Sequence, residues 1–212
     1  MTARGRFITL EGGEGVGKST QLQRLGDWLR GRGIDVLLTR EPGGTAVGEA
    51  IRAVLLDRDL PAMHADTELL LMYAARVEHV QRLIAPHLAR GGWVLSDRFA
   101  DASHVYQGAG RGIDPARIEA LERWALGGFR PDLTFLLDMP VAAGMARVRA
   151  RGAADRFETE RLAFFERVRA AYLARADREP ERFEVVDADR DADTVSAELI
   201  ARLQARWPEL AP

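Results

Sequence analysis

The stretch FITLEGGEGVGKST, which runs from residue 7 to residue 20, decides the fold of this chain. It begins with the apolar run FITLE, which has the length of a buried strand, and continues as the pattern G-x-x-x-x-G-K-[ST]. Leu22, Leu25 and Leu29 follow at helical spacing. A strand, a glycine loop and a helix in this order predict a phosphate-binding loop, in which backbone N–H groups and the helix N-terminus converge on an anion.

Lys18 within this loop is the only lysine of the chain, since the other 29 of the 30 lysine and arginine residues are arginines. An ammonium is a compact charge on a flexible stem, whereas a guanidinium is a broad planar fork. We therefore interpret Lys18 as the cation that reaches the β and γ phosphates of a nucleotide, and Ser19 as a ligand of Mg²⁺. A glycine-rich turn with an ordinary surface lysine is the alternative. The loop residues expected to bind the nucleotide are Gly12, Gly13, Glu14, Gly15, Val16, Gly17, Lys18, Ser19 and Thr20.

The composition, with 47% hydrophobic residues, is that of one globular domain over residues 1–212. A net charge of -2 gives no overall positive field, so we expect neither nucleic acid nor a membrane as a partner. The absence of cysteine excludes disulfides, thiolate catalysis and cysteine-based zinc sites, and the four histidines are scattered. The sequence has no secretory signal pattern and no apolar run near the ~18 residues of a membrane span, so we expect a cytoplasmic protein.

Five short apolar runs resemble buried parallel strands, and helical patterns separate them. The runs are FITLE at 7–11, DVLLT at 35–39, WVLSD at 93–97, LTFLLD at 133–138 and FEVVDA at 183–188. One helix is expected over the long apolar period at 69–88, and another between an N-cap at Asp114 and the glycines 127–128. This alternation predicts an α/β fold of three layers, αβα, with a five-stranded parallel sheet and ligands beyond the carboxyl ends of its strands.

A phosphate-binding loop alone is shared by GTPases, motor ATPases and small-molecule kinases. Guanine-specific GTPases read their base with Asn-Lys-x-Asp, but this chain has no asparagine and no second lysine. Motor ATPases are usually larger and act on a polymer. A small-molecule kinase is therefore the preferred class, and a nucleotide-binding regulator without catalysis is the alternative from another class.

Three further stretches resemble the bacterial thymidylate kinases: TREPGGT at 39–45, YAARVEH at 73–79, and SDRF followed by YQGAGRGI within 96–113. With the phosphate-binding loop and the arginine-rich RVRARGAADRFE at 147–158, they cover almost the whole chain in the family's order. The resemblance implies a P-loop kinase that moves the γ-phosphoryl of Mg-ATP to dTMP and forms dTDP for DNA synthesis. It also implies a homodimer. The nearest rivals are kinases of dCMP, dGMP or AMP.

At the phosphates, the resemblance gives roles to the residues around Asp97. Asp97 should hold Mg²⁺ together with Ser19, and Arg98 should bind the acceptor phosphate as a catalytic residue. A salt bridge at a strand end is the alternative for Asp97 and Arg98. Glu14, also in the catalytic set with Lys18, is implied to accept a hydrogen bond from the 3′-hydroxyl of dTMP.

Family members with an arginine after the loop carboxylate bring a catalytic cation from the loop itself, but here Gly15 stands at that position. The resemblance therefore implies that the cation comes from a lid at about residues 147–160. Arg149, Arg151 and Arg156 lie in this segment, and Arg151 is the first choice for the catalytic arginine. A solvated basic helix face is the alternative for each of them.

For the thymidine end, the resemblance implies that Arg76 hydrogen-bonds the thymine edge and that Ser103 faces the base. Tyr106 should pack below the sugar, with Gln107 nearby. The residues implied to line the sugar and the phosphate are Glu41 and Pro42. Arg40, just before them, is a weaker candidate that could pair structurally.

Two positions depart from the family pattern. Met72 stands where a phenylalanine usually stacks on thymine, and Phe99 stands where tyrosine or histidine is common. A thioether still makes favourable contact with an aromatic ring, although with less shape selectivity. The departures concern the discrimination between bases and not the reaction.

On the ATP side, Asp187 and Ala188 should read the adenine edge through backbone groups, and Arg147 should stack on the ring. Simple surface positions are the alternative for these three residues. The long apolar helix at 69–88 could supply the face of the implied homodimer, but intramolecular packing is an equally good use of it.

Overall fold

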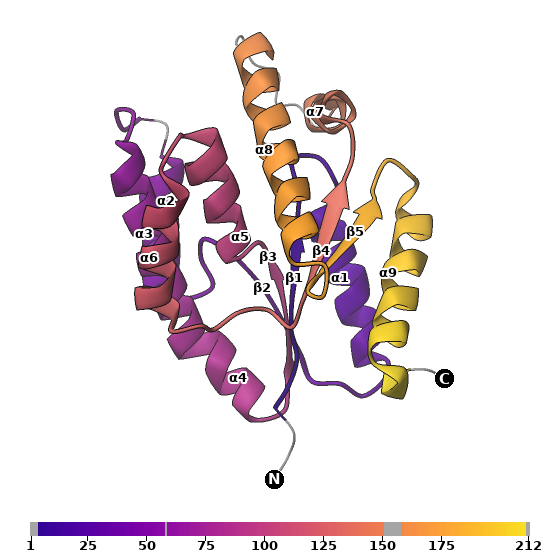
Figure 1. Ribbon diagram of the computed structural model, residues 1–212. Coiled ribbons are helices and arrows are strands. Elements are labelled where there is room, and N and C mark those ends of the chain that lie inside the picture. The colour runs from indigo at the N-terminus through magenta and orange to yellow at the C-terminus, as the bar shows by residue number, and fades with distance from the viewer. Residues whose placement is uncertain (1–3, 58, 151–157, 211–212) are drawn as a thin grey trace.

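The computed structural model describes residues 4–57, 59–150 and 158–210. Its centre is a parallel sheet in the order β2-β3-β1-β4-β5 (Figure 1). The strands are β1 (Phe7–Glu11), β2 (Val36–Arg40), β3 (Trp93–Asp97), β4 (Leu133–Asp138) and β5 (Phe183–Asp187). All five apolar runs form strands, with ends shifted by at most one residue. The predicted α/β fold with a five-stranded parallel sheet is confirmed.

Helices cover both faces of the sheet and give the predicted three layers (Figure 1). One face carries α1 (Lys18–Arg30) and α9 (Ala192–Arg206), and the other carries α3 (Ala65–His79), α6 (Pro115–Leu126) and α8 (Glu158–Arg178). The side chains of β1 alternate to match, since Ile8 and Leu10 pack toward α1 and α9 whereas Phe7 packs toward α3 and α6. The shorter helical segments are α2 (Ala46–Leu56), η1 (Val80–Ile84), α4 (Ala85–Ala89), α5 (Ala100–Ser103), η2 (His104–Gly110), α7 (Val141–Ala150) and η3 (Pro208–Leu210).

The expected helix over residues 69–88 is interrupted. α3 ends at His79, the π-helical segment η1 follows, and α4 continues from Ala85. Pro86 lies in the first turn of α4 and has no N–H, so the regular α-helical ladder cannot pass through it. The wider turn of η1 accommodates the break just before this proline.

The start and the end of α6 are confirmed as predicted. The side chain of Asp114 accepts a hydrogen bond from the backbone N–H of Ala116 at 2.8 Å, as an N-cap does. Gly127 ends the helix in the left-handed conformation, with φ of 56°. Within the described ranges, no helix has the length and apolar character needed to cross a membrane.

The candidate site is positioned by β1 and β3, which are neighbours at the centre of the sheet and end at the same edge. Ligands of doubly wound sheets bind at such a point, where the strand order reverses. The loop after β1 lies close to α7, because a Cβ on Gly15 would stand 2.1 Å from the carbonyl oxygen of Gly144. Any side chain at position 15 would therefore require α7 to move.

Candidate active site

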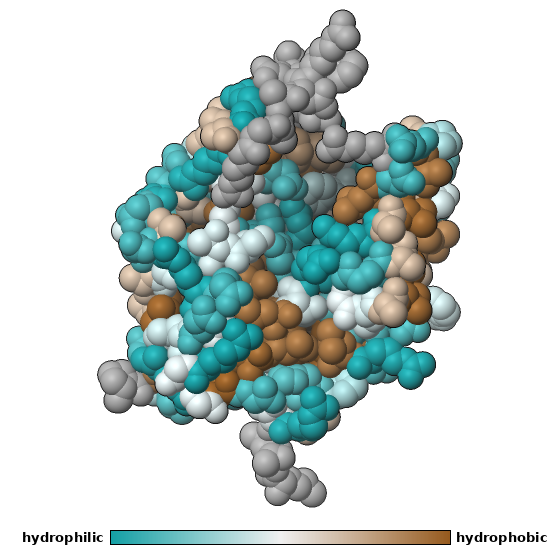
Figure 2. All heavy atoms as spheres, turned by 180° about the vertical axis from the view of Figure 1, so that it is seen from behind, coloured by the Kyte–Doolittle hydropathy of each residue, from teal (hydrophilic) through white to brown (hydrophobic). Residues whose placement is uncertain are grey.

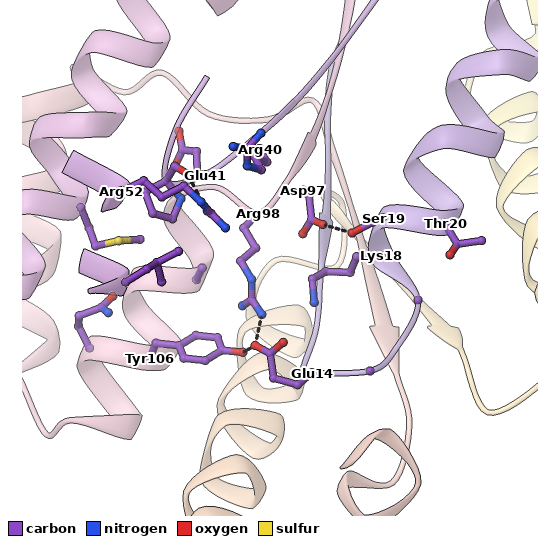
Figure 3. A pocket seen from close by; sticks show the side chains of 17 residues that line it. Glu14, Lys18, Ser19, Thr20, Arg40, Glu41, Arg52, Asp97, Arg98 and Tyr106 are labelled. Atoms are coloured by element: carbon purple, nitrogen blue, oxygen red, sulfur yellow. Dashed lines mark hydrogen bonds and ion pairs between the residues drawn. The ribbon is translucent and has the colours of Figure 1, made fainter. Parts of the chain in front are cut away.

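A cavity of about 490 Å³ opens at the carboxyl ends of β1 and β3 (Figure 3). Three groups of described residues line it. They are Glu14, Gly15, Gly17, Lys18, Ser19 and Thr20 from the loop, Arg40, Glu41, Pro42, Arg52 and Leu56 from the end of β2 and from α2, and Met72, Asp97, Arg98, Ala102, Tyr106 and Gln107 from α3 and the segment after β3. The fold thus brings most of the predicted site residues around one space.

Lys18 is buried in the first turn of α1, and its ammonium lies at the floor of the cavity (Figure 3). The Nζ atom donates to the carbonyl oxygens of Gly12, at 3.2 Å, and Gly13, at 2.7 Å. Burial, together with the nearby charge of Arg98, lowers the pKa of Lys18 to about 8. An incoming polyphosphate would offset the lost hydration and favour the charged form of this lysine further.

Ser19 and Asp97, which the resemblance implies as a metal pair, meet beside Lys18. The hydroxyl of Ser19 donates to Oδ2 of Asp97 at 2.9 Å (Figure 3). Both are hard oxygen ligands, and Mg²⁺ usually takes one or two protein oxygens and completes its shell with phosphate and water. The pair therefore fits Mg²⁺, with the hydroxyl hydrogen turned away when the cation binds.

Arg98 lies at the centre of the cavity, just after the end of β3. Its backbone has φ of 73°, a left-handed conformation that costs a non-glycine residue about 1 kcal/mol or more. Its Nη2 donates to Oε1 of Glu14 at 2.7 Å, and its guanidinium lies 4.6 Å from the ring centroid of Tyr106 (Figure 3). The hydroxyl of Tyr106 also donates to Oε1 of Glu14, at 3.2 Å.

Glu14 is thus the counter-ion of Arg98 in the protein without ligands. Burial alone would raise its pKa, but the charges of Arg98 and Lys18 outweigh burial and hold the pKa below its ordinary value. A carboxylate in a phosphate-binding loop therefore stays ionised and offsets part of the charge of these two cations until an anion replaces it.

Two arginines on the wall of the cavity were not among the firm predictions. Arg52 of α2 was missed; its Nη1 donates to the carbonyl oxygen of Pro42 at 2.9 Å. Arg40, the weaker candidate, lines the cavity and pairs with Glu49 at 2.8 Å. A signal for Arg52 exists in the sequence, because it is the one basic residue of α2, whose other charged residue is Glu49.

At the base end, Met72, Tyr106 and Gln107 line the cavity. The amide nitrogen of Gln107 donates to Oε1 of Glu68 at 2.8 Å. Its Oε1 is buried and has no hydrogen-bond partner among the residues that the structure describes. Because Gln107 lines the cavity, a small movement of its side chain would make this buried, unpaired oxygen an acceptor for a ligand N–H.

Arg76 and Ser103 are not among the described residues that line the cavity, although they lie next to it. Nε of Arg76 donates to Oε2 of Glu41 at 2.6 Å, Nη1 donates to Oγ of Ser103 at 3.1 Å, and Nη2 donates to the carbonyl oxygen of Phe99 at 3.1 Å. Nδ1 of His79 lies 3.0 Å from Oε1 of Glu41 and forms a hydrogen bond with it. Arg76 therefore has a structural partner on each nitrogen, and its contact with a base stays a prediction.

Of the residues predicted to surround the adenine, Arg147 and Ala188 are in contact. Nη1 of Arg147 donates to the carbonyl oxygen of Ala188 at 3.1 Å, and Nη2 lies 3.5 Å from Oδ1 of Asp189. Asp187 ends β5 just before them. Gly12, Gly13 and Val16 face a separate, small hollow on the other side of the loop.

The lid prediction falls mostly on residues outside the described ranges. Arg149 is an exposed residue in the last turn of α7. Arg151 and Arg156 lie outside the described residues. The choice between the lid arginines therefore stays a prediction.

Comparisons with known proteins agree with this geometry. The family model described as thymidylate kinase matches residues 10–199. A thymidylate kinase from Thiobacillus denitrificans is 55% identical over 204 residues, which cover 96% of this chain and 98% of that protein. One from Chromohalobacter salexigens is 56% identical over 207 residues, which cover 95% and 96% of the two chains. The crystal structure of thymidylate kinase from Ehrlichia chaffeensis has a TM-score of 0.79 at 33% identity, and the match covers 95% of this chain and 99% of that one. The chain therefore belongs to the thymidylate kinase family.

Proposed function

We propose that this protein transfers the γ-phosphoryl group of ATP to dTMP and forms dTDP and ADP. Membership of the thymidylate kinase family supports the reaction. The observation that carries the proposal is the order of groups in the cavity, in which Arg98 lies between Lys18 of the loop and Arg52 of α2 (Figure 3). Met72 of α3 and Gln107 of η2 line the same cavity. This order suits two nucleotides placed end to end, with both phosphate groups at the centre.

The residues of the chain act through position and charge, because the transferred group passes through a loose transition state with charge spread over three oxygens. Lys18, held by two loop carbonyls, places its ammonium where the β and γ phosphates would lie. Arg98 neutralises the acceptor phosphate. That phosphate would displace Glu14 from Arg98, and the freed carboxylate could then accept the 3′-hydroxyl of dTMP.

Ser19 and Asp97 would hold Mg²⁺, because their paired oxygen atoms suit this cation. When bound, Mg²⁺ neutralises charge on the β and γ phosphates. A lid arginine, with Arg151 as first choice and Arg149 as second, is proposed to supply the remaining cation. Arg147, Asp187 and Ala188 are proposed to surround the adenine.

A direct test mixes the purified protein with Mg-ATP and dTMP and separates the nucleotides by chromatography. We expect dTDP and ADP in equal amounts, and stable ATP when dTMP is left out. Hydrolysis of ATP that does not depend on dTMP would contradict the proposal. A nucleotide-binding regulator, the alternative class, would produce neither product.

We further propose that the protein is a homodimer. Large apolar side chains are exposed on one side of the molecule, formed by α2, α3 and α6, and Figure 2 shows apolar residues gathered along the edge where α2 and α3 lie. Val54 is 44% exposed, Leu70 is 58% exposed and Trp124 is 83% exposed. Apolar groups gathered in this way usually mark an interface. Light scattering of the wild-type protein should give twice the mass of one chain, and light scattering of the Leu70→Glu variant should give the mass of one chain.

A cytoplasmic location stays a prediction.

A further inference from the structure

Glu11, the last residue of β1, is a buried carboxylate that the proposed mechanism does not use. Both of its oxygens have partners. The backbone N–H of Phe99 donates to Oε1 at 2.7 Å, and the hydroxyl of Tyr172 donates to Oε2 at 2.7 Å. Burying a carboxylate away from water costs free energy unless the group is hydrogen-bonded in this way. The partners of Glu11 therefore indicate which groups it orients.

Tyr172 lies in α8 and is fully buried, so the hydroxyl contacts only protein groups. Burial, together with the neighbouring Glu11, raises the pKa of Tyr172 well above its ordinary value, so the hydroxyl keeps its proton. Burial and the charge of Asp101 raise the pKa of Glu11 to about 7, so Glu11 is a carboxylate above that pH. A phenol has one hydrogen, and Tyr172 then gives it to Glu11. Toward its other neighbour the oxygen can therefore only accept, and it accepts from Nη1 of Arg98 at 3.3 Å. The hydrogen bonds run in one direction, from Arg98 to Tyr172 to Glu11.

Among the residues that the structure describes, three contact the side chain of Arg98, and these contacts differ in what happens to them when a substrate binds. Glu14 and Tyr106 line the cavity, so a bound nucleotide would compete with them or press on them. Tyr172 is not among the described residues that line this cavity, and its contact would persist. The backbone of Arg98 is fixed separately, because its N–H donates to the carbonyl oxygen of Leu10 at 3.0 Å.

We propose that Tyr172 is a positioning residue for Arg98, holding the guanidinium from α8 with its own hydroxyl oriented by the buried carboxylate of Glu11. The inference rests on the proposed function, in which Arg98 binds the acceptor phosphate. It gives α8 a part in binding the acceptor phosphate, although Tyr172 is not among the described residues that line the cavity. Neither Tyr172 nor Glu11 touches the reacting atoms.

Two variants test the chain of hydrogen bonds. Tyr172→Phe removes the hydroxyl and keeps the ring. Glu11→Gln keeps the shape, but Phe99 still needs an acceptor, so the amide nitrogen must face Tyr172 and becomes a second donor to it. The hydroxyl hydrogen then has no acceptor, and the direction of the chain is broken.

For each variant, we expect KM for dTMP to rise about tenfold, the usual effect of losing one hydrogen bond to a charged group, while KM for ATP stays unchanged. The double variant should be no worse than Tyr172→Phe, because Glu11 acts on Arg98 only through the hydroxyl of Tyr172. Thr9→Val is the matched control. Thr9 is buried in β1, two residues before Glu11, and its hydroxyl bonds Thr134 at 2.8 Å without contacting Arg98. It should lower stability and leave both KM values as they are.

An unchanged KM for dTMP in a folded Tyr172→Phe protein would overturn the proposal. So would equal rises of both KM values, since those would indicate a general structural role. If Tyr172→Phe fails to fold, Glu11→Gln decides the matter by the same criteria. The wild-type protein measured alongside separates the two proposals, because failure of the proposed function would leave it without turnover of dTMP.

Discussion

The two ends of the cavity are built in different ways. At the phosphate end, Lys18, Ser19 and Asp97 lie on a loop and a strand end that the sheet holds together, since Leu10 pairs with Asp97 in adjacent strands. At the base end, side chains from α3 and η2 meet, and the buried ion pair between Glu41 and Arg76 ties α3 to the loop after β2. Backbone pairing fixes the first end, whereas helix packing and buried charges fix the second.

This difference predicts that residues at the phosphate end matter mainly for rate. Lys18→Ala should lower kcat by roughly 10²- to 10³-fold, as expected for the loss of one preorganised group that stabilises transition-state charge. Lys18→Arg should recover little of the loss, because a planar fork does not fit where a compact ammonium lies between two carbonyls. Steady-state kinetics measure both. Full activity of Lys18→Arg would show that charge alone is sufficient.

Residues at the base end should matter for stability as well. Glu41→Gln leaves the Arg76 guanidinium buried without its carboxylate, so the free energy of unfolding should fall by about 3 kcal/mol. Asp97→Asn, at the phosphate end, should change it by no more than about 0.5 kcal/mol. Urea denaturation compares the two variants with wild type. Similar losses from both would remove the contrast between the two ends.

The orientation of Gln107 sharpens the account of the base end. Glu68 can only accept, so the amide nitrogen of Gln107 must face it and the amide oxygen is left as the acceptor. An acceptor there suits the N3–H of thymine and opposes the N3 lone pair of cytosine. Glu68→Gln frees the amide to turn, and the preference for dTMP over dCMP should fall about tenfold.

Competition between dTMP and dCMP measures that preference. Arg117→Gln is a suitable control, because it removes only a surface ion pair to Asp66 on the same helix as Glu68. A preference that is unchanged in Glu68→Gln would mean that Gln107 does not read the base.

The smallest expected effect concerns pH at the phosphate end. Lys18 has a pKa of about 8 in the free protein, and a bound polyphosphate favours its charged form. The complex therefore holds more protons than the free protein above pH 8, and affinity falls as the pH rises. KM for ATP should increase about fourfold between pH 7 and pH 8.5. Lys18→Arg does not titrate in this range, so a similar rise in that variant would assign the effect to another group.

The phosphate end could be predicted closely from the sequence because its residues are near each other in the chain or at strand ends. The loop motif predicted Ser19, the family resemblance at SDRF implied Asp97 as its partner, and the structure brings the two within hydrogen-bond distance. The sheet itself was also predictable, since a fully buried parallel strand is a continuous apolar run.

The base end could not be predicted in the same way, because it depends on how helices pack. The resemblance named Arg76 and Ser103 as base contacts. It could not show that the guanidinium of Arg76 already donates hydrogen bonds to Glu41 and to the carbonyl oxygen of Phe99. Arg52 reaches the cavity only because α2 packs beside the loop after β2, where Arg52 donates to the carbonyl oxygen of Pro42. This tertiary relation has no local sequence signal beyond one basic residue in α2.

The most direct test of the central claim is the kcat/KM of the purified protein for dTMP, dUMP, dCMP, dGMP and AMP with Mg-ATP. We predict the highest value for dTMP, a lower one for dUMP because the thymine methyl is absent from a cavity end lined by Met72, and values at least tenfold lower for the other three. Equal values for dTMP and dCMP would contradict the account. The phosphate end would then stand as described, but the base end would not select thymine.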